Sequence, residues 1–577
     1  MENSNCMMVA ALDFGTTYSG YAFSFRNDFE TEPLKIQANP VWMTGSSQFM
    51  SLKTPTCLLL DKDQKFVAFG FQAENMYAEC VLDNVQDDFY YFHRFKMYLH
   101  SNKNITSTMV LEDITGKTLS AFDVFKLSIK ALVNHLLETL DKRGTGVKHD
   151  EVKWVLTVPA IWTDTAKQFM RSSAEEAGIN PDKLILSLEP EAASILCQYL
   201  PITKSEMGFT VSKIGTEYMV VDLGGGTADI TVHQKVENDQ LKEKHRATGN
   251  NCGGTSVDSR FFILLEKIFG KQLMESLKKE DPLAYLDIER GFEAAKRNID
   301  PNNKVKVTMT FPFTTLDKLC KEINKQGLET LVKASDYANE IKLHGDKIRF
   351  DVGLIVKLFK PSIDSVISLM KEVLSSKNTK GVTHFLMVGG FSECNLLQNE
   401  IRKSFPGKRI IVPKDAGLSV LKGAVLFGHR PDYIKSRIMP RTYGVMTSLP
   451  YDPRKFDKKY RVLMDGEERC DKIFSLIASV DDSVEAGTKV EKSYFTPLPN
   501  QEKMDFNVYV STEANPCYVD EEGCKHLCTP TIEFPDICPD KRWVDVEFEL
   551  GNTEIKMTAK DRKSGKEIKA QINLLHP

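Results

Sequence analysis

Two short segments, each starting at an aspartate and containing glycine and threonine, hold the residues of this chain best suited to bind a phosphorylated ligand. They are Asp13–Thr17, with the sequence DFGTT, and Asp222–Asp229, with the sequence DLGGGTAD. Glycine lets the backbone turn close to a ligand, so that N–H groups can point at phosphate oxygens, and a threonine hydroxyl adds a donor. The aspartate can lie beside a hydrated Mg²⁺ on those phosphates. Two such loops facing each other would hold a triphosphate between two lobes.

The two segments differ in specificity. DFGTT alone is also typical of an ordinary tight turn. Three consecutive glycines between two strands, Gly224–Gly226, are rarer, because glycine weakens a strand pair unless a ligand or another backbone comes close. A pair of turns without a ligand stays open as an alternative, and ligand binding is the interpretation that the pair favours.

Each loop lies between two short apolar segments typical of strands, within a longer alternation of strand-like and helix-like segments. This alternation continues over about the first 430 residues and indicates an α/β architecture. The run 152–158 is apolar and rich in β-branched residues, and Thr163 or Asp164 can cap a helix that runs to Gly178. Apolar residues recur every three or four positions over 122–140, which predicts a packed helix. Each of two similar lobes would then carry one of the two loops.

The pattern changes between Gly428 and Pro440, where helix-length periodic segments stop. Short β-type runs separated by turn residues follow at 474–480, 505–512, 543–550 and 554–560. Strands at this spacing predict a β-sandwich of about 140 residues, large enough for its own core. We therefore expect an α/β domain at 1–430 and a small all-β domain at 440–577, with no helical lid after it.

Composition limits the classes of function. The chain has 577 residues, of which 42% are hydrophobic and 27% charged, as in ordinary globular proteins. Lys and Arg number 75 against 79 Asp and Glu, so no basic excess attracts nucleic acid or an anionic membrane. No apolar run approaches the roughly 20 residues of a membrane span. The 12 cysteines are scattered and read as reduced residues, so we expect a cytoplasmic protein, with the nucleus left open.

Further motifs follow the first loop in a fixed order. They are Thr157–Asp164 (TVPAIWTD), Leu188–Ala193 (LEPEAA), Glu293–Arg297 (EAAKR), Met387–Phe391 (MVGGF) and Asp415–Gly417 (DAG). With the two loops, they resemble the actin-like ATPase superfamily and, within it, the 70-kDa heat-shock protein family of chaperones, over about residues 8–428. The segments 474–488 and 555–566 are similar to the peptide-binding sandwich of that family. The FKM at 95–97 and GGF at 389–391 look closest to its divergent member 12 branch.

The resemblance implies a two-lobed ATPase with ribonuclease-H-like lobes, which binds ATP or ADP with Mg²⁺. It implies that Glu189 positions or activates the attacking water and that Asp13 and Asp222 orient the water shell of the metal. A basic residue near the γ-phosphate would be Lys96 or Arg94; Lys96 is favoured, because a compact ammonium suits a point contact. The nucleotide-binding residues implied are Gly15, Thr16, Thr17, Tyr18, Gly224, Gly225, Gly226, Thr227, Asp229, Gly253, Gly254, Glu293, Lys296, Arg297, Gly389, Gly390, Phe391 and Asp415. A solvated helix face at 293–297 and an ordinary turn at Gly389 are the alternatives.

The chain also departs from the family pattern. Lys167 stands where the family has an arginine of its inter-domain relay, and Phe391 stands where a serine is common, adding a stacking face for the base. The acidic, leucine-rich linker of the family is not visible between Leu426 and Arg441. These departures leave ATP binding as the expectation and make peptide clamping driven by hydrolysis doubtful.

Four cysteines and a histidine gather in the last part of the chain: Cys517, Cys524, Cys528, Cys538 and His526. Zinc sites usually have ligand pairs separated by roughly two to four residues, and only Cys524 and Cys528 approach that spacing. Ordinary core or loop cysteines are favoured, with a metal site as the alternative.

The leading functional hypothesis is an ATP-binding chaperone-like protein of the stress response, with slow ATP hydrolysis and a divergent β domain that contacts client or signalling proteins. The alternative is a nucleotide-sensing adaptor that binds ATP with negligible turnover. A sugar or metabolite kinase shares the superfamily fold, but the appended β domain argues against it.

Overall fold

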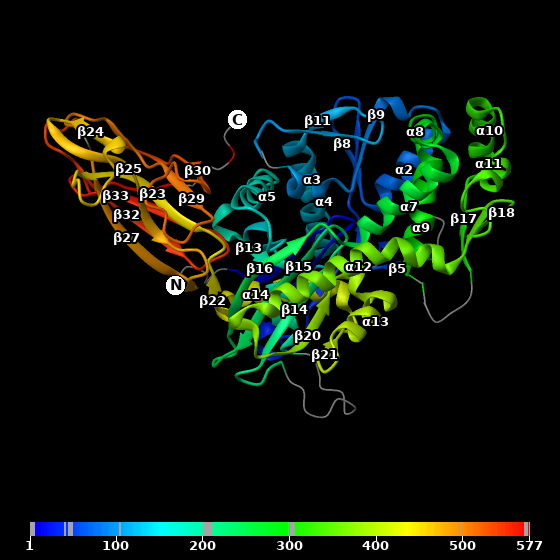
Figure 1. Ribbon diagram of the computed structural model, residues 1–577, viewed down its shortest axis with the longest axis horizontal. Coiled ribbons are helices and arrows are strands. Elements are labelled where there is room, and N and C mark those ends of the chain that lie inside the picture. Colours follow the sequence, from blue (N-terminus) through cyan, green and yellow to red (C-terminus); the bar gives the residue numbers. More distant parts are fainter. Residues whose placement is uncertain are drawn as a thin grey trace. The chain divides into compact units, whose positions relative to one another are not determined.

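The computed structural model describes residues 6–39, 42–43, 50–102, 105–199, 211–297, 299, 306–496, 498–570 and 575 (Figure 1). Contacts divide the chain into two compact units. Unit 1 comprises Met1–Trp162, Phe169–Ile230 and Thr248–Pro431, and unit 2 comprises Thr163–Gln168, Thr231–Ala247 and Asp432–Pro577. The assignment of domains to 1–430 and 440–577 stays a prediction of the sequence.

The first sheet of unit 1 is built around an N-terminal hairpin. Its order is β13-β12-β1-β2-β3, with β6 also paired to β2. Strand β1 runs parallel to β12 and antiparallel to β2, where Asp13 lies opposite Gly20. The hairpin therefore presents the residues between its strands, Gly15–Thr17, at the end of the sheet. The strands are β1 (Met8–Phe14), β2 (Tyr18–Phe25), β3 (Gln37–Ala38), β6 (Thr54–Pro55), β12 (Val152–Val158) and β13 (Leu184–Leu188).

A second sheet places the other glycine loop in the same way. It contains the strands β21-β20-β14-β15-β16 in that order, and β14 is parallel to β20 with Asp222 opposite Val388. Asp222 and Gly389 thus reach the same edge of the sheet. The strands are β14 (Glu217–Leu223), β15 (Ala228–Lys235), β16 (Leu241–Asn250), β20 (Val382–Val388) and β21 (Arg409–Ile411).

The helices of unit 1 bury apolar stripes against these sheets and against one another. The predicted stripe over 122–140 is confirmed as one buried face of α4, which begins at the capping residue Ser120. Helices α7, α8 and α9 pack together (Figure 1). Helix α14 packs so closely on α6 that a Cβ on Gly423 would lie 1.7 Å from the Ala192 carbonyl oxygen. The helices are α1 (Arg26–Thr31), α2 (Phe71–Leu82), α3 (Tyr98–Ser101), α4 (Ala121–Lys142), α5 (Asp164–Glu176), α6 (Glu189–Cys197), α7 (Gly254–Phe269), α8 (Lys271–Glu280), α9 (Pro282–Arg297), α10 (Phe313–Asn324), α11 (Leu328–Ala334), α12 (Val352–Ser375), α13 (Asn395–Ser404) and α14 (Ser419–His429).

Small sheets complete unit 1. They are β8-β7-β9 (Phe66–Phe69, Cys57–Asp61, Phe89–His93), β10-β11 (Val110–Glu112, Thr118–Ser120), β17-β19-β18 (Val307–Thr310, Lys347–Phe350, Ile341–His344) and β4-β5 (Trp42–Met43, Met50–Ser51). Among the described residues, no helix is long and apolar enough to cross a bilayer.

Most of unit 2 consists of two antiparallel sheets, of order β24-β25-β23-β29-β30 and β27-β32-β33-β34. Both contribute to one apolar core, in which Val445 and Val508 of the first sheet join Val546 and Met557 of the second. This arrangement is compatible with the expected sandwich. The strands are β23 (Thr442–Pro450), β24 (Arg461–Met464), β25 (Glu467–Ala478), β27 (Thr488–Phe495), β29 (Val508–Ser511), β30 (Cys524–Cys528), β32 (Trp543–Leu550), β33 (Lys556–Asp561) and β34 (Glu567–Ala570).

One prediction about this region needs correction. The run 505–512 is not one strand: Asp505 ends β28 (Lys503–Asp505), which pairs with β31 (Thr531–Glu533), and β29 then joins β23. The chain changes partner here because the backbone N–H of Phe506 donates to the carbonyl of Pro530 and the carbonyl of Asn507 accepts from Met446. The segment after α14 forms β22 (Ile434–Ile438), which pairs with β16 and with β26 (Ser483–Glu485).

Candidate functional site

Unit 1 contains a cavity of roughly 680 Å³ at the ends of its two large sheets. This volume is typical of sites that bind molecules the size of a nucleotide. The cavity is lined by all the predicted catalytic residues and by all but two of the predicted nucleotide-binding residues. Those lining it are Asp13, Gly15, Thr16, Thr17, Tyr18, Lys96, Glu189, Asp222, Gly224, Gly225, Gly226, Thr227, Gly254, Glu293, Lys296, Arg297, Gly389, Gly390, Phe391 and Asp415.

The structure brings the two glycine loops into contact with each other. A Cβ on Gly225 would lie 2.5 Å from Thr17 Oγ1, and a Cβ on Gly226 would lie 2.7 Å from Thr16 Oγ1. Real Cβ atoms essentially never come within 3.0 Å of such atoms, so neither position has room for a side chain. Glycine is therefore required because the backbone of one loop lies against the threonines of the other.

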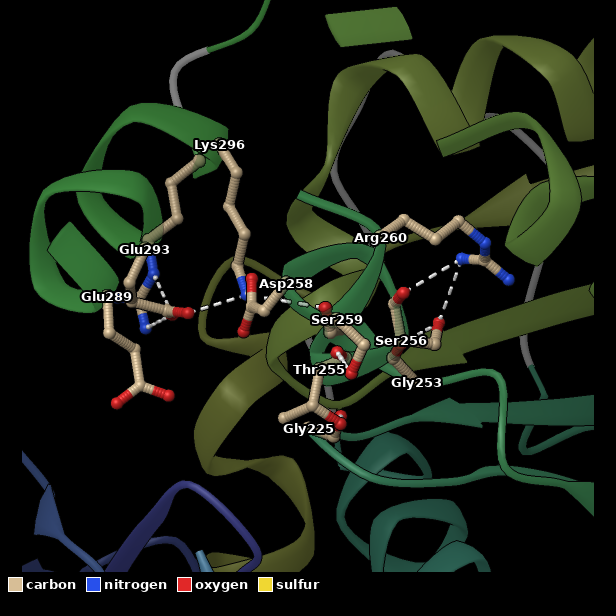
Figure 2. Close-up of polar contacts among 12 residues, drawn as sticks. Gly225, Gly253, Thr255, Ser256, Asp258, Ser259, Arg260, Glu289, Glu293 and Lys296 are labelled. Atoms are coloured by element: carbon tan, nitrogen blue, oxygen red, sulfur yellow. Dashed lines mark hydrogen bonds and ion pairs between the residues drawn. The ribbon is translucent and has the colours of Figure 1, made fainter. Parts of the chain in front are cut away.

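The start of helix α7 holds the second glycine loop in place (Figure 2). The N–H groups of Gly253, Gly254 and Thr255 donate to the loop carbonyls at distances of 3.2, 3.1 and 2.8 Å, and Thr255 Oγ1 adds a bond of 2.9 Å to Gly225 O. The first N–H groups of a helix have no partners within the helix, and here the loop carbonyls accept from them. Gly253 thus lies behind the loop and does not line the cavity.

Buried carboxylates and lysines face each other near the two glycine loops, at the end of the cavity where the phosphates are expected. Lys96 Nζ donates to Glu189 Oε1 at 2.8 Å, and only 3% of the Lys96 side chain is exposed. Lys53 Nζ donates to Asp13 Oδ2 at 2.6 Å, and Thr157 Oγ1 donates to Asp13 Oδ1 at 3.0 Å.

Negative charge exceeds positive charge in this cluster, and the pKa values of its acids show the effect. Burial and the neighbouring carboxylates of Glu189 and Asp229 raise the pKa of Asp222 well above the usual aspartate range. Burial also raises the pKa of Glu189, although Lys96 opposes it. Burial alone would raise the pKa of Asp13 as well, but the charges of Lys53 and Lys96 hold that pKa below its usual value. A cation bound among these acids would relieve their mutual repulsion.

The donor set suits Mg²⁺ held through water. Carboxylate oxygens are the ligands that Mg²⁺ prefers, and the ion usually keeps several of its waters. Among the described residues, no group of three His, Cys, Asp or Glu side chains lies close enough to bind a metal directly. That Asp13 and Asp222 hold the ion through its water shell stays a prediction of the sequence.

The structure separates the two candidates for the basic residue. Lys96 lines the cavity. Arg94, with a left-handed φ of 52°, instead forms ion pairs with Asp258 at 2.9 Å and Glu289 at 2.8 Å. The geometry therefore favours Lys96 at the phosphate end, and its role in hydrolysis stays a prediction.

The far end of the cavity is formed by α9 and by the turn after β20. Lys296 is buried, and its Nζ lies 2.6 Å from Asp258 Oδ1 and 2.5 Å from Glu293 Oε2 (Figure 2). The Lys296 and Glu293 side chains are therefore not on a solvated face, whereas the Arg297 side chain is 58% exposed. Gly389 has φ +81°, and a Cβ there would lie 2.5 Å from Asp222 Oδ1. Phe391 stacks on Phe359, with ring centroids 6.4 Å apart.

Comparisons with known proteins agree with this geometry. A family model described as Hsp70 protein matches residues 93–448. Heat shock 70 kDa protein 12A of Homo sapiens is 34% identical, with 100% of this chain and 92% of the relative aligned. Heat shock 70 kDa protein 12B of Homo sapiens is 31% identical over the same shares. Chaperone protein DnaK of Endomicrobium trichonymphae is 24% identical over 80% of this chain and 63% of its own length.

The chain belongs to the Hsp70 family. Within the family it belongs to the divergent branch of heat shock 70 kDa protein 12, which confirms the resemblance read from the sequence. Hsp70 proteins bind ATP or ADP with Mg²⁺ on an actin-like ATPase domain, so unit 1 has the fold of a nucleotide-binding protein of this family.

Two residues expected from the Hsp70 motifs do not line the cavity. One is Gly253, described above. The other is Asp229, whose Oδ2 accepts a hydrogen bond from the backbone N–H of Ala160 at 3.1 Å. Burial and the charge of Glu189 raise the pKa of Asp229 to about 8. This hydrogen bond joins β15, the strand after the glycine loop, to the segment after β12.

Several lining residues were not predicted from the Hsp70 motifs. They are Leu52, Lys53, Met97, Pro159, Trp162, Phe359, Glu393, Cys394, Lys414, Gly417, Leu418 and Val420. For Met97, Pro159, Trp162 and Gly417 a signal existed, because they lie within quoted motifs. Lys53 and Phe359 lie in no motif, and the sequence gives no signal for either.

The cysteines near the end of the chain do not come together as one group of possible metal ligands in the described part of unit 2. Cys524 and Cys528 begin and end β30, Cys528 and Cys538 are buried, and Cys517 is exposed. The four thiols are free, and no group of metal ligands is found in the described part of the chain.

Proposed function

We propose that this chain is an ATP-binding, chaperone-like protein that hydrolyses ATP slowly in the unit 1 cavity and contacts protein partners through its β region. The observation that carries the proposal is the meeting of both glycine loops with buried lysines and carboxylates in one cavity of roughly 680 Å³. Such a cavity offers backbone donors, hydroxyls and cations to a phosphate chain, and acids to a hydrated metal.

ATP would lie with its phosphates between the two loops and its adenosine against α9. Thr16 and Thr17 supply hydroxyls from one loop, and Thr227 supplies one from the other. At the base end, the Lys296–Glu293 ion pair fixes both side chains before a ligand arrives, so little side-chain entropy would be lost on binding. Phe391 offers an aromatic face next to them.

Hydrolysis in this site would depend on positioning and charge. Glu189 would orient a water molecule toward the γ-phosphate, and Lys96 would neutralise charge that develops on the phosphate oxygens. When bound, Mg²⁺ would add further charge neutralisation at the phosphates. No covalent nucleophile is required, and the lysine–glutamate pair is already positioned at 2.8 Å.

One observation favours the adaptor as a second candidate. Glu189 Oε1 already accepts a charged hydrogen bond from Lys96, and this contact competes with the hydrogen bond that would orient water. If the pair persists in the complex with ATP, turnover would be negligible and ATP binding itself would be the signal.

Partner contact in unit 2 is supported by apolar side chains that the strands leave exposed. Leu463 on β24 is 72% exposed, and Leu449 and Leu476 on neighbouring strands are exposed too. Such side chains are available to a protein partner, and because single exposed leucines are common on protein surfaces they mark no particular docking site.

The test is ATP turnover of the full chain with and without an unfolded peptide, alongside calorimetric titration with Mg-ATP. Turnover stimulated by the peptide would support the chaperone. Tight binding without turnover would support the adaptor. Absence of binding would refute both.

A further inference from the structure

Lys53 is a cation in the cavity to which no motif assigns a role. Its Nζ lies 2.6 Å from Asp13 Oδ2, and the side chains of the two residues are only 18% and 8% exposed. An ion pair this close and this sheltered differs from a surface pair, whose charges are screened by solvent. Lys53 is also one of the residues that line the cavity.

The fold fixes Lys53 at this place. It precedes β6, which pairs with β2 so that Thr54 lies opposite Ser19. Thr56 Oγ1 donates to the carbonyl of Gly15 at 2.7 Å, which ties this segment to the first glycine loop. The stem of Lys53 passes close to Gly20, the residue opposite Asp13 in the hairpin. The lysine is thus held by the same hairpin that carries Asp13.

The two aspartates predicted to face the metal have different surroundings. Asp13 accepts from Lys53, and Lys53 with Lys96 offsets its charge. Asp222 makes no ion pair in the described part of the chain, and its charged neighbours are mainly acids. Lys53 is therefore bonded directly to Asp13, whereas Asp222 has no bonded cation among the described residues and is reached by the charge of Lys53 only from a distance.

We propose that Lys53 binds the phosphate chain of the nucleotide and supplies, on the Asp13 side, part of the charge neutralisation that Mg²⁺ otherwise gives. An ammonium has three N–H donors, so it can donate to Asp13 and to a phosphate oxygen at the same time. The ligand class is a nucleoside di- or triphosphate, and binding tolerates removal of the divalent metal. This inference rests on the proposed nucleotide binding.

The experiment is calorimetric titration of the full chain with ATP, in excess MgCl₂ and in excess EDTA. We expect the dissociation constant to rise by no more than about ten-fold in EDTA. The substitution Lys53→Gln is expected to raise the dissociation constant in both media, because a charged hydrogen bond is lost. The rise relative to the unmodified chain should be at least about ten-fold larger in EDTA than in MgCl₂. Lys53→Arg keeps the charge and is expected to bind ATP in EDTA nearly as the unmodified chain does. Lys65→Gln, which removes an exposed lysine outside the cavity, is the matched control.

Each other result overturns a definite part of the reasoning. Binding of Mg-ATP by the unmodified chain that disappears in EDTA would refute the inference and leave the proposed function intact. So would an equal loss of affinity in both media for Lys53→Gln, or a Lys53→Arg that behaves like Lys53→Gln. No binding in either medium would refute the proposed function itself. Thermal melting without ATP checks that the variants fold. If a variant does not fold, loss of ATP binding in EDTA by the unmodified chain would still refute the inference.

Discussion

Replacing Gly225 by valine tests the contact between the two glycine loops. A Cβ at this position would lie 2.5 Å from Thr17 Oγ1 and 2.9 Å from Thr17 Cγ2, where ordinary contacts begin near 3.4 Å. The valine adds two methyl groups to that atom, so the loops must separate by roughly an ångström. Separated loops would lose hydrogen bonds to the charged phosphates, each worth about 1.5–3 kcal/mol, so ATP affinity is expected to fall on the order of 100-fold.

That loss can be read as a change in the stabilisation that ATP gives. At an ATP concentration of about 100 times the dissociation constant, binding stabilises the unmodified chain by about 2.7 kcal/mol. With affinity reduced about 100-fold, the same concentration gives only about 0.4 kcal/mol. Overpacking itself costs about 1–3 kcal/mol, so the quantity to compare is the ATP-dependent shift within each variant.

The assay is thermal melting with and without Mg-ATP, with Gly353→Ala as the control. Gly353 lies near the start of α12, away from the cavity, and a Cβ there would meet only the Asp351 carboxylate at 3.3 Å. The control is expected to keep the full ATP-dependent rise in Tm. An undiminished rise in Gly225→Val would refute the argument from loop contact, and no rise in the unmodified chain would refute nucleotide binding.

Three further predictions follow from the site. Glu189→Gln is expected to keep ATP affinity and to slow turnover by roughly 10²-fold or more, because the amide is a poor proton acceptor; unchanged turnover would remove Glu189 from its role. Asp229→Asn is expected to flatten the pH dependence of stability. The pKa of Asp229 rises from 3.8 to about 8 on folding, so the folded chain binds the extra proton and loses stability as pH rises across that window. Urea unfolding at pH 6 and pH 9 measures this, and an equal slope in both proteins would contradict it. In hydrogen exchange, ATP is expected to protect the loops of the cavity and to change 474–512 little, because Lys167 lacks the bidentate geometry of an arginine. The loop segments concerned are 13–17, 222–229 and 389–391.

Local backbone requirements are what made the site predictable from sequence. A position with no room for a side chain, such as Gly225, requires glycine, so the requirement can be recognised from the sequence alone. The same is true of Gly389, whose positive φ and closeness to Asp222 both exclude a side chain. Strand β12 and helix α4 were predictable for a similar reason, because their patterns of apolar residues depend on their own periodicity.

Residues placed by distant pairing were not predictable. Lys53 reaches Asp13 because β6 pairs with β2. The sequence around Lys53 does not predict that pairing. The resemblance also gave residue types without their orientation. Neither Asp229 nor Gly253 lines the cavity, because Asp229 accepts a hydrogen bond from Ala160 and Gly253 donates to the loop carbonyl of Gly226. The change of partner between β28 and β29 was missed because both halves of 505–512 have strand composition.

The hydrogen bonds between the glycine loop and the start of α7 have a consequence for nucleotide exchange. Gly224–Gly226 are hydrogen-bonded to this helix end, and Asp258 on the same helix is bonded to Lys296 on α9, so α7 links the loop proposed to bind phosphate to the helix proposed to bind adenosine. If nucleotide binds as proposed, we expect its release to involve movement of this linked block relative to the N-terminal hairpin, so that a partner bound to α7 or α9 would change the exchange rate.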